Sequence, residues 1–301
     1  MESVRRWWHD LSGLVLPAEC GGCGTARTVL CPECRAALHG STPRRVRPDP
    51  EPPGLPAVHA AARYADEVRA VLLAHKERGA LALTRPLGAA LAGAVRVGVG
   101  EVGEGEGEGP PPRVQAVLLV PVPSAPRATR SRGHDPARRI ALAAASELRG
   151  AGVPARVAAV LRQRRVVADQ AGLNSRQRLD NLVGALAVVA GGGRLLLGAG
   201  AVVLVDDLVT TGASLAEAAR AVRAAVAEER AAGAFGRARW EEGATAVYAG
   251  AAREGRGVRP SGARKGGIGP VPVRQMGAVR AGVLCAAVVA APPDAFEINR
   301  N

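Results

Sequence analysis

The fold of this chain is decided by the stretch Ala201-Val-Val-Leu-Val-Asp206-Asp207-Leu-Val-Thr210-Thr211-Gly212-Ala213-Ser214. Its five leading apolar residues are typical of an interior parallel strand. A helical apolar pattern follows the small-residue turn, at Leu215, Ala218, Ala219, Val222 and Val226. The order of strand, loop and helix predicts an α/β protein with a parallel sheet flanked by helices.

The turn and the two carboxylates before it predict a cradle for a ribose phosphate. Hydroxyls, free N–H groups and the positive end of the helix dipole would hold the phosphate at Thr210, Thr211, Gly212, Ala213 and Ser214. Asp206 and Asp207, at the carboxyl end of the strand, would accept hydrogen bonds from sugar hydroxyls. The alternative is a strand that merely ends in Asp-Asp before a turn, which leaves the order of the three elements to coincidence.

Four cysteines near the N-terminus form the second signal. Cys20-Gly-Gly-Cys23 and Cys31-Pro-Glu-Cys34 are two Cys-x2-Cys knuckles separated by seven residues. This spacing predicts four thiolates around one tetrahedral, structural Zn²⁺, with no ligand position left for a substrate. Disulfides are the alternative, and a reducing compartment would disfavour them. The fifth cysteine, Cys285, is expected in a buried strand.

Charge and hydropathy indicate a cytoplasmic protein with anionic ligands. The net charge is +13, and the window 127–182 holds twelve Arg against four acidic residues, which gives +8. Such a window favours phosphate or pyrophosphate binding, with a solvated basic face as the alternative. No run of eighteen apolar residues is free of charge, so no membrane partner is expected. The apolar stretch before Cys20 is too short and interrupted for a secretory signal.

The chain divides into a core domain with additions. Two helices are predicted around 68–75 and 83–95, a strand at 117–120, a helix at 136–148 and a last strand at 283–291. Of the histidines, only His134 lies near a motif, and a surface or loop position is expected for it. The predicted divisions are a zinc-ribbon-like module at 1–41, a linker at 42–58, an α/β domain at 59–228 with a disordered loop at 98–112, a low-complexity insertion at 229–278, and the final strand and tail at 279–301.

With these pieces in order, the chain resembles the ComF family, in which a four-cysteine zinc ribbon precedes a type I phosphoribosyltransferase domain. The likeness rests on the cysteine knuckles and on five later segments: Lys76 to Gly79, Pro121-Val-Pro123, Arg132-Gly133, Gln170 to Leu173 with Arg178 and Asn181, and Asp206 to Ser214. One departure is His134-Asp135, where the family usually has an aromatic residue and Asn. Another is Val167, where a Thr is common.

The resemblance implies transfer of a phosphoribosyl group from phosphoribosyl pyrophosphate (PRPP), bound with Mg²⁺, to a nitrogen nucleophile. Thr210, Thr211, Gly212, Ala213 and Ser214 would bind the 5′-phosphate, and Asp206 and Asp207 the ribose hydroxyls and indirectly the metal. Pro121 and Pro123 would border the pyrophosphate, and Arg132 and Arg178 would neutralise it as it leaves. Thr210 cannot act as a general base at neutral pH, so a base must come from elsewhere or none is needed.

Two alternatives to an enzyme stay open. ComF relatives are associated with uptake of single-stranded DNA, and the basic face could bind strands through their phosphates. Aromatic residues make up only 2% of the chain, so stacking platforms for bases are few. The other alternative is a regulator that senses PRPP without turnover. The sequence identifies neither the nucleophile nor the oligomeric state, a homodimer being one option.

Overall fold

The structure is a computed structural model that describes residues 19–104, 116–124, 129–130, 132–165, 177, 181–251 and 283–297. Side chains are described for these residues except 102–104, 234–251 and 283–284. The helices are α2 (Pro32–His39), α3 (Asp66–Lys76), η1 (Leu81–Leu83), α4 (Thr84–Glu104), α6 (Pro136–Gly150), α8 (Gly192–Leu197), α9 (Ala213–Ala251) and η2 (Pro293–Phe296). The strands are β1 (Arg44–Val46), β2 (Val58–Arg63), β3 (Val117–Pro121), β4 (Ala155–Val157), β5 (Leu161–Gln163), β6 (Leu186–Val188), β7 (Ala201–Leu208) and β8 (Val283–Ala291).

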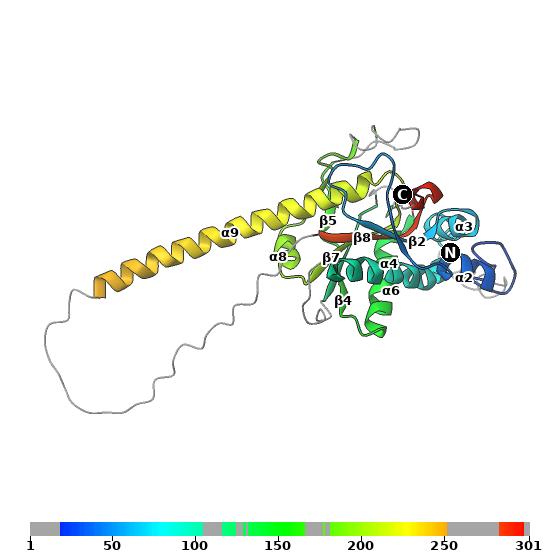
Figure 1. Cartoon of the computed structure of the whole chain (residues 1–301), viewed down its shortest axis with the longest axis horizontal. Coiled ribbons are helices and arrows are strands. Elements are labelled where there is room, and N and C mark those ends of the chain that lie inside the picture. The colour runs from blue at the N-terminus through cyan, green and yellow to red at the C-terminus, as the bar shows by residue number, and fades with distance from the viewer. Residues whose placement is uncertain are drawn as a thin grey trace, which may run out of the picture.

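A six-stranded sheet in the order β1-β2-β8-β7-β3-β4 forms the centre of the molecule (Figure 1). Neighbours from β2 to β4 pair in parallel, and β1 pairs antiparallel with β2 at one edge. A separate antiparallel pair joins β5 to β6. The fold is therefore the predicted α/β class, with a mostly parallel sheet.

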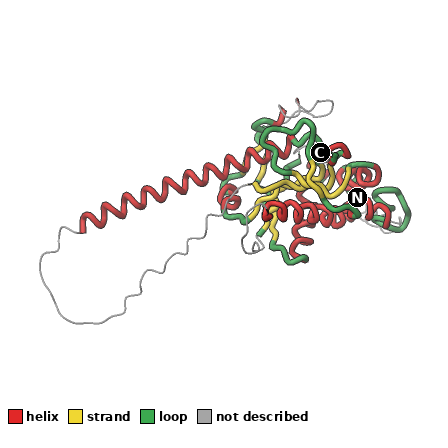
Figure 2. The backbone as a smooth tube through the Cα atoms, viewed as in Figure 1, coloured by secondary structure: helices red, strands yellow, loops and turns green. Residues whose placement is uncertain are grey.

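Helices cover both faces of this sheet (Figure 2). Successive side chains of a strand point to opposite faces, and β7 shows the division clearly. Val203 and Val205 pack in a cluster with α2, α3, α4 and α6, whereas Val202 and Leu204 pack in a second cluster with α8 and α9. Because both faces are covered, β7 is apolar without alternation, as in parallel sheets generally.

The predicted strands at 117–120 and 283–291 and the helix at 136–148 are confirmed, and Cys285 is buried in β8 as expected. Three boundaries need correction. Part of the expected linker forms the edge strand β1, through pairing with β2 that its polar sequence does not reveal. Helix α4 continues to Glu104, so residues 98–104 are helical and not loop. Helix α9 continues to Ala251 past the expected boundary at 228 (Figure 1).

The cysteine segment shares the core of the α/β domain. Cys20, Cys31 and Cys34 are buried, and they belong to the same apolar cluster as Val71 and Leu83. The segment is thus packed against α3 and η1 and does not stand apart as a free module. None of the helices in the described part of the chain combines the length and apolar character needed to cross a membrane.

Candidate functional site

The loop between β7 and α9 makes a tight turn at Gly212, directly before the first turn of the helix. Gly212 has φ +73°, and a Cβ there would lie 3.0 Å from Leu55 Cδ2 and 3.1 Å from Pro48 Cγ, so both the backbone angle and the space favour glycine. Helix α9 begins at the next residue. A small hollow opens here, lined by Asp206 and all residues from Leu208 to Leu215. The N–H groups of the first turn of α9 therefore border a polar depression.

Asp206 and Asp207 lie at the carboxyl end of β7 as predicted, but on opposite faces of the sheet. Asp207 is buried with its side chain 8% exposed, and its Oδ2 lies 2.8 Å from Lys76 Nζ. Asp206 is half-buried and lines the loop hollow. The backbone N–H of Asp207 donates to Asp206 Oδ1 at 2.8 Å, which fixes the Asp206 carboxylate beside the loop.

Electrostatics distinguish these groups further. Burial, and after it the neighbouring Asp207 carboxylate, raise the pKa of Asp206 well above its ordinary value. A cation that approaches this carboxylate would favour its ionised form. Burial lowers the pKa of Lys76, but the Asp207 carboxylate outweighs this and raises it, so Lys76 is charged at neutral pH. The site thus combines a fixed ammonium with a carboxylate that is costly to ionise.

Arg132 is brought to the same edge of the sheet, held by a residue next to Lys76. Arg132 Nε donates to Glu77 Oε2 at 3.2 Å, and its Nη2 lies 3.1 Å from Glu77 Oε1. Its side chain is only 18% exposed. This two-point contact sets the direction of the guanidinium plane. Arg178, the other predicted pyrophosphate contact, lies outside the described residues.

Pro121 and Pro123 follow the neighbouring strand. Pro121 ends β3 opposite Val205 of β7, and the N–H of Val122 donates to Val205 O at 2.9 Å. The turn therefore leaves the sheet directly beside Asp206 and Asp207. Ser124, which follows Pro123, donates to Asp135 at 3.4 Å, and Asp135 caps the N-terminus of α6. All predicted site residues that the structure describes thus gather at one edge of the sheet, apart from the cysteine ligands.

His134 lies in a loop, which is one of the two positions expected for it, but it is buried and not on the surface. The residue is 9% exposed, and its ring lies edge-on to that of His75, with 5.8 Å between the centroids. His134 Nδ1 contacts Arg132 O at 3.1 Å, so it carries the hydrogen. Burial, and then the charges of His134 and Arg139, lower the pKa of His75 to about 4, against an opposing effect of Asp207. His75 is therefore neutral at physiological pH.

Four cysteine sulfurs form a cluster at the start of α2. The Sγ atoms of Cys20, Cys23, Cys31 and Cys34 all lie within 4.8 Å of one another. Backbone N–H groups point at two of them, from Cys31 to Cys20 Sγ at 3.3 Å and from Cys34 to Cys31 Sγ at 3.4 Å. A Cβ at Gly22 would lie 2.5 Å from Cys34 Sγ, so the first knuckle requires glycine for close approach.

This cluster fits a metal ion. Zn–S bonds of about 2.3 Å in a tetrahedron place sulfurs about 3.8 Å apart, within the spread seen here. Burial opposes ionisation of Cys20, yet the surrounding N–H groups, that of Cys31 first, lower its pKa to about 6. Burial and then the neighbouring Cys31 raise the pKa of Cys34. Four thiolates at this separation need a cation among them, and the four residues are positioned to bind one.

Comparisons with known proteins do not assign this chain to a family. A scan against models of protein families matched none of them to this chain, and a search among curated proteins found no relative. The fold and sites by themselves define an α/β protein that has a mostly parallel sheet and an N-terminal cluster of four cysteines positioned to bind a metal ion.

Sequence reasoning missed Lys76 and Glu77 as members of the candidate site. Both stand at the end of α3, and they reach Asp207 and Arg132 from a distant part of the chain. The only signal was the likeness of the Lys76 to Gly79 segment to a known family, which gave these residues no role. Their contacts arise from packing of α3 over the carboxyl edge of the sheet, and periodicity does not encode this.

Proposed function

We propose that this chain is a ComF-type phosphoribosyltransferase that binds PRPP with Mg²⁺. One observation carries the proposal: Asp206 and the residues from Leu208 to Leu215 line a single hollow at the N-terminus of α9. A carboxylate for sugar hydroxyls and N–H groups for a phosphate therefore sit side by side, as a ribose 5-phosphate requires. The cysteine cluster would hold a structural Zn²⁺, the second feature shared with the ComF family.

The residues have distinct roles in the proposed transfer. The loop from Thr210 to Ser214 binds the 5′-phosphate and anchors the sugar. Asp206 accepts from a ribose hydroxyl, and Asp207 holds Lys76 in place over the same edge. Asp206 would hold Mg²⁺ indirectly, through the sugar hydroxyls of bound PRPP, and the metal would supply neutralisation of pyrophosphate charge. Arg132 neutralises further charge as the bond from the sugar to pyrophosphate breaks and a nitrogen nucleophile takes its place.

No side chain on the loop serves as a general base. Thr210 is exposed, and its hydroxyl does not accept a proton at neutral pH. The imidazole of His75 is a residue type that can act as a general base, but its ring is buried and hydrogen-bonded to Thr84 Oγ1 at 3.1 Å. The proposal therefore favours a nucleophile that is already neutral and needs no deprotonation before attack.

The test is a screen of nitrogen nucleophiles for release of pyrophosphate from PRPP in the presence of Mg²⁺. The proposal predicts release with at least one nucleophile, and loss of release in Asp206→Asn. Tight PRPP binding without release from any nucleophile would instead support a sensing regulator. Absence of PRPP binding at millimolar concentration would contradict the transferase and the sensor together.

Single-stranded DNA binding is the less favoured alternative, because some arginines that it would use have internal partners. Arg165 donates to Asn181 O at 2.7 Å and to Val183 O at 3.1 Å. Arg132 is bound to Glu77. A strand-binding surface would instead lose affinity by similar amounts on each Arg→Ala change, with a salt slope reduced by about 0.7 per lost phosphate contact.

A further inference from the structure

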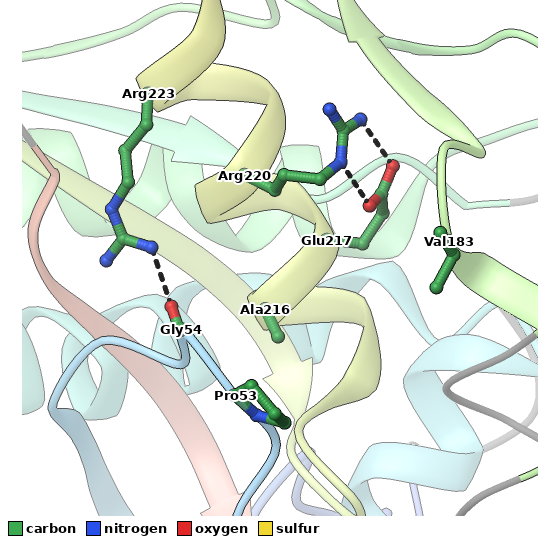
Figure 3. A pocket seen from close by; sticks show the side chains of 7 residues that line it. All are labelled: Pro53, Gly54, Val183, Ala216, Glu217, Arg220 and Arg223. Carbon is green, nitrogen blue, oxygen red and sulfur yellow. Dashed lines mark hydrogen bonds and ion pairs between the residues drawn. The ribbon is translucent and has the colours of Figure 1, made fainter.

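A second cavity lies beside α9, beyond the loop that would hold the phosphate (Figure 3). Its volume is about 400 Å³, within the range of small-molecule sites. Three separate parts of the chain form its walls. The lining residues are Pro53 and Gly54 from the segment before β2, Val183 from the turn before β6, and Ala216, Glu217, Arg220 and Arg223 from α9.

The α9 wall presents a stripe in which Ala216, Arg220 and Arg223 are spaced as neighbours on one helix face. Pro53, Val183 and Ala216 give this wall and its surroundings an apolar surface (Figure 3). Val183 is 59% exposed although it is a large apolar side chain. The cavity therefore offers an apolar floor, with the Arg223 guanidinium bound to Gly54 on one side and the Arg220 guanidinium bound to Glu217 on the other (Figure 3).

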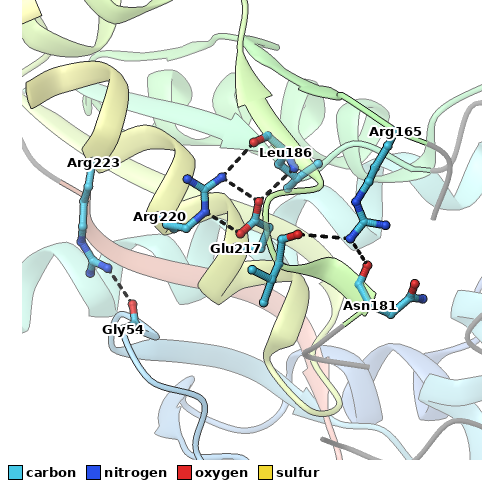
Figure 4. A network of polar contacts seen from close by, with 8 residues as sticks. Gly54, Arg165, Asn181, Leu186, Glu217, Arg220 and Arg223 are labelled. Atoms are coloured by element: carbon cyan, nitrogen blue, oxygen red, sulfur yellow. Dashed lines mark hydrogen bonds and ion pairs between the residues drawn. The ribbon is translucent and has the colours of Figure 1, made fainter. Parts of the chain in front are cut away.

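The single acid in the cavity is already neutralised. Glu217 is 4% exposed, and its carboxylate accepts from Arg220 Nε at 2.7 Å, from Arg220 Nη2 at 2.8 Å and from the N–H of Leu186 at 2.9 Å (Figure 4). Burial would raise the pKa of Glu217, but the Arg220 guanidinium and the backbone donor outweigh this and lower it. Glu217 is thus ionised and paired, and one positive charge remains among the lining residues.

That remaining charge belongs to Arg223, whose one described bond runs from Nη1 to Gly54 O at 2.7 Å. Among the described residues, Arg223 Nη2 and Arg220 Nη1 have no hydrogen-bond partner. Guanidinium N–H groups at an apolar wall favour an anion such as a carboxylate or phosphate. An uncharged polar ligand would gain less from this arrangement.

We propose that this cavity is a ligand site, separate from the phosphate loop, for a flat and largely apolar ring that carries one anionic group. The ring would cover Ala216, Pro53 and Val183, and the anion would accept from Arg223, whose Nη2 is not used by the bond to Gly54. The segment 48–55 contributes to this cavity and also contacts Gly212 of the loop. The site does not depend on the proposed transferase activity, and its test uses no PRPP.

The test measures binding of naphthoate, and of its uncharged counterpart naphthamide, to the full chain. Saturation-transfer NMR detects the bound probe. For a ligand of this size, we expect a naphthoate Kd of roughly 1 mM, with naphthamide about tenfold weaker. Arg223→Gln should weaken the affinity for naphthoate by about tenfold and leave the affinity for naphthamide nearly unchanged. The control is Arg138→Gln, an exposed arginine on α6 at the other face of the sheet, which should change neither.

Two variants test the position of the site. Ala216→Trp fills the cavity and should abolish binding of both probes, with circular dichroism to verify the fold. Val183→Asp changes an exposed residue that tolerates charge, and it should repel naphthoate alone. Equal binding of the two probes, or naphthoate binding that survives both Val183→Asp and Arg223→Gln, would overturn the proposal. Absence of naphthoate binding at 10 mM, about ten times the expected Kd, would overturn it as well.

Discussion

Lys76 Nζ lies 2.8 Å from Asp207 Oδ2, and this ion pair joins the end of α3 to the end of the central strand β7. Asp207 is nearly buried, while Lys76 keeps about a third of its side chain exposed. The contact gives the carboxyl edge of the sheet a defined arrangement of one ammonium and two adjacent carboxylates.

Lys76→Met should lower the free energy of unfolding by about 1 to 3 kcal/mol, because it leaves the Asp207 carboxylate buried without its partner. Partial exposure of Lys76 keeps the effect below that of a fully buried pair. Denaturant unfolding of Lys76→Met, Asp207→Asn and the double variant gives the coupling free energy. Arg69→Met, an exposed cation on the same helix, is the control. A coupling free energy of zero would show that the pair does not stabilise the fold.

Asp206→Asn should stabilise the folded protein at neutral pH while it weakens ligand binding. The folded pKa of Asp206 is raised by burial and by Asp207. Its contribution to stability is therefore present below the unfolded pKa, near 3.9, and is lost as pH rises through the folded value. Asparagine keeps an acceptor for the Asp207 N–H without the charge, and we therefore expect a higher free energy of unfolding at pH 7 in Asp206→Asn.

Thermal unfolding as a function of pH measures this effect. The difference in Tm between Asp206→Asn and the unchanged protein should be small near pH 4 and should grow as pH rises. A variant that is less stable at every pH would contradict the assignment of Asp206 as a carboxylate held for function at the expense of stability.

His75 should make the protein sensitive to acid. Its folded pKa is lowered to about 4 from 6.5, so the unfolded chain binds more protons between these values and stability falls as pH drops through that window. We expect protonation of this group to lower the free energy of unfolding by about 2 to 3 kcal/mol across that window. His75→Gln, which retains an amide near Thr84, should flatten the pH dependence between 6.5 and 4. An unchanged slope in His75→Gln would assign the sensitivity to other groups.

Removal of metal should destabilise the α/β domain and not only the cysteine segment, because Cys20, Cys31 and Cys34 belong to the same core as Val71 and Leu83. We expect about one Zn²⁺ per chain by metal analysis, lost in the double variant Cys20→Ser with Cys31→Ser. Cys285→Ala is the matched control, since this thiol is buried in β8. Unfolding that is unaffected by chelation, or zinc retained in the double variant, would contradict a structural metal.

The local part of the site could be predicted from sequence, and the long-range part could not. Asp206, Gly212 and the start of α9 are neighbours in the chain, so composition and order suffice to place them. Lys76 and Glu77 reach the site only through packing of α3. The burial of His134 also follows from a contact with another helix, and nothing in the residues around it predicts that contact.

The same limit applies to the fold. The apolar runs of β3, β7 and β8 are enough to predict buried strands. Strand β1 is short, polar and next to prolines, and it exists because β2 offers an unpaired edge. Helix α8 begins among three glycines, which are poor helix formers, and it is held by packing of Leu196 in the core shared with α9. Tertiary contacts decide these elements.

Calorimetric titration with PRPP and Mg²⁺ tests the central claim most directly. The unchanged protein should bind about one PRPP per chain. Asp206→Asn should weaken binding by about 1 to 3 kcal/mol for the lost charge-assisted hydrogen bond, with its fold intact by circular dichroism. Glu147→Gln removes a carboxylate in the last turn of α6, away from this edge, and should bind normally. No heat of binding at millimolar PRPP, or equal affinity in all three proteins, would contradict a ribose-phosphate site at the β7 to α9 loop.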